Sequence, residues 1–241
     1  MDKILNFQLS LFGSFKNIKP DNDIAMRLIE KLKEDDFIPA TVDVAYVDTA
    51  AKEIKSESRL QMVSQDKSWS IVFLQERIDL NYDYNGSSLY SEFGKIFIYA
   101  KSILEKVFEI FSNEKGNRLA VNGKILLNEM VPEKRTIFMK RFSNPPKVYG
   151  NKPITEWHLR FNAKSSMGIA DDTKEICNNI IEIGDCIICE KEKKENRMLL
   201  SLDINTLPEN RDLRFTYENL LYFTSDVEKW MEKELAEIEE G

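Results

Sequence analysis

The amphipathic stretch at residues 89–112 constrains the fold more than any other part of the sequence. Its apolar residues recur at spacings of three and four, which places them on one stripe of an α-helix, while Lys95, Lys101 and Glu105 lie largely on the other side. The stripe consists of Phe93, Ile96, Phe97, Ala100, Ile103, Leu104, Val107, Ile110 and Phe111. A helix of this kind covers a core, so the remainder of the chain has to provide one.

The residues before this helix predict one strand, one short helix and a run of further strands. Residues 4–15 alternate in part between apolar and polar side chains, and residues 21–35 combine an acidic N-cap cluster with a short apolar stripe. Segments rich in β-branched or aromatic residues follow at 37–48, 58–64, 68–74 and 76–85. In the last one, Ile78, Leu80, Tyr82 and Tyr84 share one face, and Arg77, Asp79, Asn81 and Asp83 share the other. The pattern predicts an antiparallel meander with one dry and one wet face.

The same order of elements recurs after Gly116. A strand-like segment at 117–130 precedes a short helix that begins near Pro132, and strands at 155–163, 175–189 and 196–207 precede a terminal helix between Tyr217 and Ile238. We therefore predict an α+β fold of two related β-α-β-meander-α halves, residues 1–116 and 117–241. The halves would share an antiparallel sheet, with the long helices packed on one face and a pseudo-twofold axis between them.

Charge and composition limit the classes of function. The formal net charge of −7 disfavours a general nucleic-acid binder, because phosphate-tracking surfaces usually make a domain basic. The three cysteines, Cys177, Cys186 and Cys189, are an odd number in a chain too long to need a disulfide framework, which favours a reducing compartment. No secretory signal or membrane-spanning run is present. We expect a cytoplasmic protein that does not enter a membrane.

Histidine and cysteine patterns offer little support for catalysis or for a metal site. His158, the only histidine, alternates onto a polar strand face with Arg160, and a general base or ligand-binding group competes there with a solvated strand face. Cys186 and Cys189 have CxxC spacing, but no second pair exists to complete a zinc site, which favours inert thiols. Neither a P-loop nor GxGxxG occurs, so we expect no metal and no cofactor.

Two sets of acidic residues are candidates for sites. Asp43, Glu53 and Lys55 follow the loose D...ExK order of magnesium-dependent nucleases, in which two acids hold the ion and the lysine assists the water. Asp79, Asp83 and Asp203 lie on polar faces of the strands that end the two meanders, and with His158 and Arg160 they form the predicted ligand-binding set. Polar faces of antiparallel sheets are also commonly just solvated.

A basic stretch at residues 132–152 is the candidate partner-binding segment. It contains six basic residues and one acidic residue, with aromatic residues among them. The candidate contacts are Lys134, Arg135, Lys140, Arg141 and Lys147. Basic and aromatic side chains together suit single-stranded nucleic acid or an acidic protein. The terminal stretch 218–241 carries a net charge of −6, and the overall acidity favours pairing with it, within the chain or in a homo-oligomer, over nucleic acid.

Several segments together resemble a sporadically distributed bacterial family of uncharacterised proteins. The resemblance lies in the Trp-containing segment 67–74, the Tyr-ended segment 76–84, the long helix, the strand at NRLAVNGKI, and RMLLSLDINTL followed by the terminal helix. In the family, the strand at the place of NRLAVNGKI is an Arg-and-Asn strand of the type RIGLRYVN. That strand corresponds here to NRLAVNGKI, which keeps Arg118 and Asn122 and lacks the glycine and the tyrosine. The family carries no known activity, and its patchy distribution implies mobile-element or defence-linked gene neighbourhoods.

The predicted function is that of a non-catalytic binding protein. Its partner would be another protein or a second copy of the chain, and the resemblance adds an accessory, sensor or inhibitor role in a mobile-element or phage-defence system. One alternative is a small-molecule sensor that uses the crevice between the halves, lined by Trp69, Tyr82, Tyr84 and Trp157. The other alternative is the magnesium-dependent nuclease.

Overall fold

The structure is a computed structural model that describes residues 2–20, 22–48, 52–86, 92–129, 131–142, 152, 154, 156–190 and 193–240. The first elements are β1 (Lys3–Gly13), α1 (Asn22–Leu32), β2 (Phe37–Asp48), β3 (Glu53–Ser64), β4 (Trp69–Phe73), β5 (Arg77–Asp83) and α2 (Phe93–Phe108). The remaining ones are β6 (Gly116–Leu126), α3 (Pro132–Phe142), β7 (His158–Ala170), β8 (Thr173–Glu190), β9 (Lys193–Thr206) and α4 (Tyr217–Glu240). Among the described residues, no helix is both long enough and apolar enough to span a membrane.

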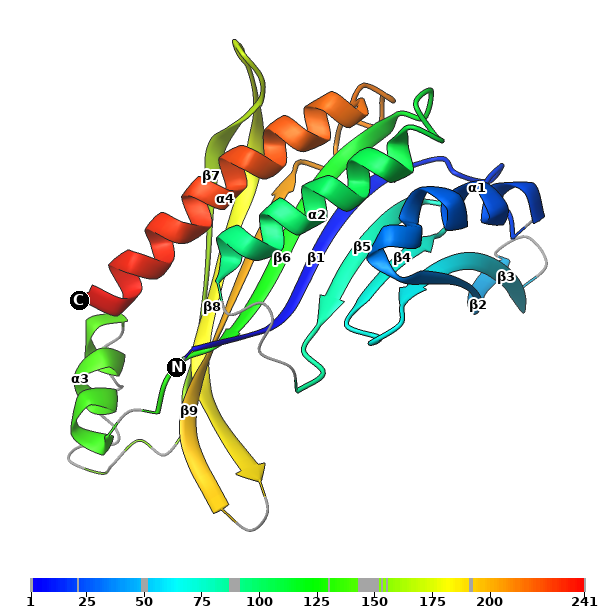
Figure 1. The fold of residues 1–241 in the computed structure, drawn as a ribbon. Helices are drawn as coiled ribbons and strands as arrows, with labels where there is room; N and C mark the ends of the chain where they lie inside the picture. Colours follow the sequence, from blue (N-terminus) through cyan, green and yellow to red (C-terminus); the bar gives the residue numbers. More distant parts are fainter. Residues whose placement is uncertain are drawn as a thin grey trace.

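All nine of these strands form one antiparallel sheet in the order β2-β3-β4-β5-β1-β6-β9-β8-β7. The predicted α+β class with an antiparallel sheet is confirmed, although the chain is mostly sheet (Figure 1). The strands up to residue 83 and those from residue 116 onward form contiguous blocks, which meet where β1 pairs with β6. The middle of the sheet therefore joins segments that are far apart in the sequence.

The core lies where the apolar face of the central strands meets α2 and α4. Phe7, Leu9 and Leu11 of β1 are at most 1% exposed, and the predicted stripe of α2 is buried from Phe93 to Val107. The helix ends at Phe108, earlier than the sequence pattern indicates. A side chain at Gly123 of β6 would come within 2.9 Å of the Phe93 ring and 3.9 Å of Met231. This position therefore requires glycine because two helices approach the strand there.

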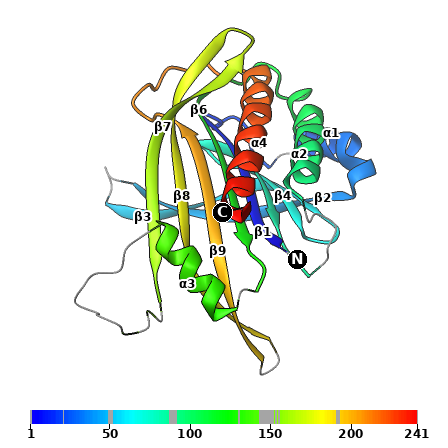
Figure 2. The same ribbon diagram turned by 90° about the vertical axis from the view of Figure 1, so that its left-hand side faces the viewer.

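The helices α2 and α4 lie side by side (Figures 1 and 2). Lys101 of α2 and Glu228 of α4 form an ion pair at 2.6 Å, and α4 also packs against β7 and β6. The helix α4 runs without interruption through Ser225, whose hydroxyl donates to the Leu221 carbonyl oxygen. Thr216 caps its N-terminus, and the hydroxyl and backbone N–H of Thr216 both interact with Asn219.

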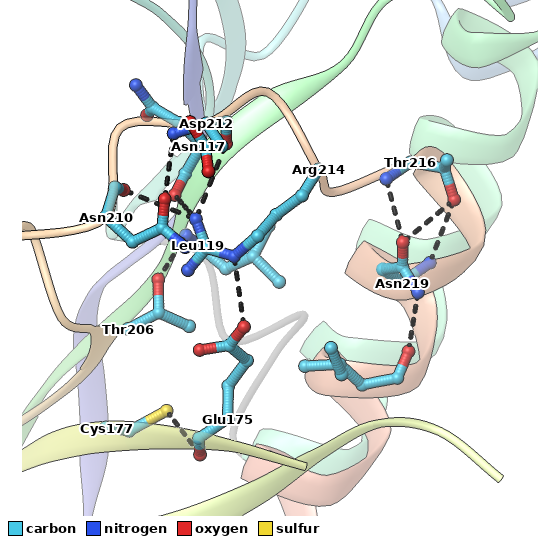
Figure 3. A network of polar contacts seen from close by, with 11 residues as sticks. Asn117, Leu119, Glu175, Cys177, Thr206, Asn210, Asp212, Arg214, Thr216 and Asn219 are labelled. Atoms are coloured by element: carbon cyan, nitrogen blue, oxygen red, sulfur yellow. Dashed lines mark hydrogen bonds and ion pairs between the residues drawn. The ribbon is translucent and has the colours of Figure 1, made fainter. Parts of the chain in front are cut away.

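A polar network connects the start of α4 to β6 and β8 (Figure 3). The guanidinium of Arg214 donates to Glu175 of β8 at 3.0 Å and to the carbonyl oxygen of Asn117 at 2.8 Å. It also lies over the Phe215 ring, with its central carbon 4.2 Å from the ring centroid. Together with the full burial of Phe215, these contacts hold the segment before α4 against β6 and β8.

Candidate functional site

Polar side chains cover the second face of the central strands, opposite the core. Residues that lie directly opposite each other in antiparallel strands point to the same face, so the register defines three rows that cross six strands. The rows are Arg160, Glu182, Ser201, Lys124, Asn6 and Asp83; Asn162, Ile180, Asp203, Asn122, Gln8 and Asn81; and Lys164, Asn178, Asn205, Ala120, Ser10 and Asp79. We call these eighteen residues the polar face; Ser10, Asp79, Ala120, Ile180 and Asn205 are buried, and the other thirteen are partly or fully exposed.

The polar face is rich in amides. Six of its residues are asparagine and one is glutamine, although asparagine is disfavoured in strands. Folding preference therefore does not explain this composition. Several amides bond to neighbours on the face: Asn122 Nδ2 donates to Gln8 at 3.4 Å, and Asn178 Nδ2 donates to Asn205 at 3.3 Å. Each amide both donates and accepts, which makes this a surface for directional hydrogen bonding.

Asp79 is the one buried carboxylate among the predicted ligand-binding residues. It is 3% exposed, accepts a hydrogen bond from the Ser10 hydroxyl at 2.6 Å and lies 2.7 Å from Arg77 Nε. Burial raises the pKa of Asp79 above its ordinary value, and the contacts with Ser10 and Arg77 oppose this rise. Burying the ionised carboxylate therefore costs desolvation free energy, which the contacts with Ser10 and Arg77 offset only in part.

The raised pKa of Asp79 predicts how the free energy of unfolding depends on pH. Above the raised pKa, Asp79 is ionised in both the folded and the unfolded state, and its desolvation lowers the stability of the fold in full. As the pH falls through the raised pKa towards the ordinary value of 3.8, the folded state binds the proton first, so the penalty is relieved. We expect the free energy of unfolding of the wild type to increase relative to Asp79→Asn as the pH is lowered.

Urea unfolding of both proteins at several pH values between about pH 7 and about pH 4 measures this difference. Asp83→Asn, which removes an exposed carboxylate from the same face, controls for the loss of one negative charge. A difference between wild type and Asp79→Asn that shrinks or stays constant as the pH falls contradicts the prediction.

An arginine-phenylalanine-arginine cluster lies beside the polar face. Phe12 of β1 is directly opposite Arg77 on one side and Arg118 on the other, and the two guanidinium carbons lie 5.7 and 4.9 Å from its ring centroid. Arg118 donates to Asn205 at 3.0 Å, while its buried Nε has no hydrogen-bond partner among the described residues. A hollow of about 330 Å³ adjoins Phe12 and Arg77 and includes Arg59 in its lining.

The structure places the five predicted ligand-binding residues on one side of the sheet but not at one point. His158 and Arg160 both lie next to Glu182, with His158 Nε2 at 3.6 Å and Arg160 Nε at 2.8 Å from its carboxylate oxygens. Asp79 and Asp203 are three strands apart, roughly 14 Å. These residues therefore form parts of an extended surface and do not form one pocket.

The three residues of the nuclease pattern do not converge. Asp43 lies opposite Ser58 and accepts a hydrogen bond from its hydroxyl, whereas Glu53 and Lys55 are odd-numbered positions of β3 and point to the other face. Glu53 is also five positions further along the hairpin, roughly 17 Å. Within the described ranges, no group of three or more His, Cys, Asp or Glu side chains is arranged to hold a metal ion.

The basic stretch divides between structural and exposed residues. Arg135 of α3 donates through Nε to Asp185 of β8 at 2.6 Å, and this contact raises the pKa of Arg135 and attaches α3 to the sheet. Lys140 and Arg141 are exposed, and the Arg141 guanidinium lies over the rings of Phe138 and Phe142. The side chain of Lys134 and the whole of Lys147 lie outside the described residues.

The ends of α3 and α4 meet at a hollow of about 200 Å³. Arg141 and Phe142 contribute to its lining from α3, and Glu234, Glu237 and Ile238 contribute from α4. The structure thus brings the basic and acidic stretches of the sequence to one place. Burial and the nearby Glu237 raise the pKa of Glu234, and the neighbouring Lys233 opposes this rise.

The aromatic residues predicted to line a crevice lie in two separate places. Trp69 and Tyr82 are 2% and 1% exposed and pack on each other with ring centroids 5.2 Å apart. Tyr84 lies just after β5, under the Lys3 ammonium, while Trp157 precedes the edge strand β7, which lies five strands away from β5. Trp69 instead lines a hollow of about 420 Å³ with Tyr99. The four residues therefore do not share one pocket.

The cysteines differ in environment. Burial raises the pKa of the Cys177 thiol to about 12, which keeps it protonated and unreactive at neutral pH. Cys186 is partly buried and unbonded, and the side chain of Cys189 lies outside the described residues.

Comparison of the chain with protein-family models, with curated proteins and with solved structures finds no match in any of the three.

Proposed function

We propose that this chain is a non-catalytic binding protein that recognises another protein through the polar face. The observation that carries the proposal is the amide content of the three rows, six asparagines and Gln8. Asparagine and serine supply adaptable hydrogen bonds at recognition surfaces. A row of six strands spans roughly 24 Å, which suits a protein surface better than a small molecule.

Charge on the polar face supports the same choice of partner. Lys124, Arg160 and Lys164 are balanced by Asp83, Asp203 and Glu182 within the same rows, while the buried Asp79 pairs with Arg77. A nucleic acid would favour an excess of positive charge. A partner protein with its own mixed polar surface matches this balance.

The proposal includes an internal duplication. Asp79 of β5 lies opposite Ser10 of β1, and Asp203 of β9 lies opposite Asn122 of β6. Asn81 and Asn205 follow two positions later, within the similar sequences Ile-Asp-Leu-Asn and Leu-Asp-Ile-Asn. A twofold axis between β1 and β6 that exchanges Leu9 with its partner Val121 also exchanges Ser10 with Asn122 and Asp79 with Asp203. This equivalence supports two related halves that meet at the centre of the polar face.

The proposal also keeps a cytoplasmic location, which the thiols of Cys177 and Cys186 support because neither is in a disulfide. An accessory, sensor or inhibitor role in a mobile-element or phage-defence system rests on the family resemblance alone.

Affinity purification of tagged protein from the native host tests the binding function. The wild type is expected to retain a stoichiometric protein partner, and the double variant Asn81→Arg/Asn122→Arg is expected to lose it, because two long cations replace amides in the middle row of the face. Lys95→Glu, an exposed substitution on α2, is the control and should retain the partner. A double variant that keeps its partner overturns the assignment of the face, and a wild type that carries a metabolite and no protein overturns the function.

A further inference from the structure

The strand β7 forms one edge of the sheet and is thirteen residues long (Figure 2). The backbone N–H of Asp185 in β8 donates to the carbonyl oxygen of Trp157 at 3.0 Å, so odd-numbered residues direct their backbone groups to β8. In an antiparallel ladder the alternate residues direct theirs away from it. The outward-facing positions are His158, Arg160, Asn162, Lys164 and Ser166.

The helix α4 covers only one end of this edge. The outward N–H of Gly168 donates to Asp226 of α4 at 2.9 Å, and Asn219 Nδ2 donates to the carbonyl oxygen of Ile169 at 2.9 Å. Residues 158–166 have no such cover from the part of the chain that the structure describes, and most of them are exposed. An uncovered edge strand is a template for pairing with another strand.

The side chains along the edge differ between its two faces. His158, Arg160 and Lys164 lie on the same side of the sheet as the polar face. His158 and Arg160 are next to Glu182. On the other face Phe161 is 45% exposed and borders the hollow of about 200 Å³ that Phe142, Ile181, Ile183 and Ile238 also line. A strand added here would place alternate side chains beside cations on one face and beside Phe161 and the apolar part of this hollow on the other.

We propose that the open edge of β7 binds an extended segment of a partner protein in which acidic and apolar residues alternate. Backbone hydrogen bonds from the outward positions would add the segment as a tenth strand, its carboxylates would lie beside Arg160 and Lys164, and its apolar side chains would lie beside Phe161. The inference deepens the proposed protein-binding function and rests on it for the identity of the occupant. A second copy of β7 fits less well, because it would gather the cations of both copies along one joined edge.

A synthetic ten-residue peptide of alternating glutamate and valine is the probe. Fluorescence anisotropy with the full chain is expected to show binding that is at least about tenfold tighter than for the matching lysine and valine peptide. Amide hydrogen exchange of the outward positions 158–166 is expected to slow when the acidic peptide is bound. Equal affinity for the two peptides, or unchanged exchange along the edge, overturns the inference.

Asn162→Pro removes an outward donor without removing a bond to β8, and proline is tolerated on edge strands. This variant should bind the acidic peptide at least about tenfold more weakly while its thermal unfolding stays close to that of the wild type. Thr41→Pro, on the opposite edge strand β2, is the matched control and should bind as the wild type does. Arg160→Glu/Lys164→Glu should reverse the preference towards the lysine peptide.

The two proposals can fail separately. Full peptide binding by Asn162→Pro refutes the edge inference, while partner loss in Asn81→Arg/Asn122→Arg would still support the polar face. The opposite result is that Asn162→Pro weakens peptide binding while Asn81→Arg/Asn122→Arg keeps the protein partner. This result supports peptide binding at the β7 edge and refutes partner binding at the polar face. A dimer in solution that Asn162→Pro dissociates overturns the inference, because the occupant would then be a second copy.

Discussion

Replacing Arg59 by alanine is expected to lower the free energy of unfolding by about 3–5 kcal/mol. Arg59 lies on β3 and is 1% exposed. Its guanidinium donates to the carbonyl oxygens of Phe73 and Phe15, both at 2.9 Å, and pairs with Glu57 at 3.3 Å. Alanine would leave two buried carbonyl groups without this donor, and each unsatisfied group costs about 1–3 kcal/mol.

Urea denaturation followed by circular dichroism measures this loss. Arg160→Ala removes an arginine whose side chain is 51% exposed and paired at the surface, so it should cost no more than about 1 kcal/mol. Arg59→Lys should fall between the two, because an ammonium group does not reproduce the geometry of the guanidinium. Similar losses for Arg59→Ala and Arg160→Ala would show that the buried contacts do not carry this stability.

Arg59 also illustrates what local sequence pattern misses. The segment 58–64 predicts a strand, and Arg59 occupies a position that suggests solvent, since arginine is rarely buried unless paired. Its partners Phe15 and Phe73 are 44 and 14 residues away in the sequence. Only the path of the chain between β1 and α1 brings the Phe15 carbonyl to it, and no local periodicity encodes that path.

The faces of the strands were easier to predict than their order. Alternation placed Asp79 and Asp83 away from Leu80 and Tyr82, and the structure agrees, because side-chain direction in a strand depends only on period. The central pairing of β1 with β6 depends on contacts between residues more than a hundred positions apart. The polar face extends across that pairing, so its continuity was not visible in the sequence.

The boundaries of β3 and β7 differ from the predicted ones for physical reasons. β3 begins at Glu53, within a segment that reads as a polar break, because the β2–β3 hairpin extends into solvent and its first residues are exposed. β7 starts at His158 and continues to Ala170, through Lys164 and Ser166, because α4 covers its last residues. Exposed polar strands lack the apolar alternation on which a sequence-based prediction depends.

Phe97→Ala is expected to lower the free energy of unfolding by about 3–5 kcal/mol, the usual cost of removing a buried phenyl ring. Phe97 of α2 is fully buried, and its ring centroid lies 5.0 Å from that of Phe7 on β1. The contact attaches the helix that constrains the fold to the central strand of the sheet. Thermal and urea unfolding measure the loss.

The neighbouring Ile98 is the matched control, because it lies on the same helix and is 67% exposed. Ile98→Ala should change the stability by no more than about 0.5 kcal/mol. A double-mutant cycle of Phe7→Leu and Phe97→Leu should give a coupling energy of about 0.5–1.5 kcal/mol, as expected for an edge-to-face aromatic pair. Equal losses for Phe97→Ala and Ile98→Ala would mean that α2 is not attached to the sheet through its apolar stripe, and the burial of that stripe would need another explanation.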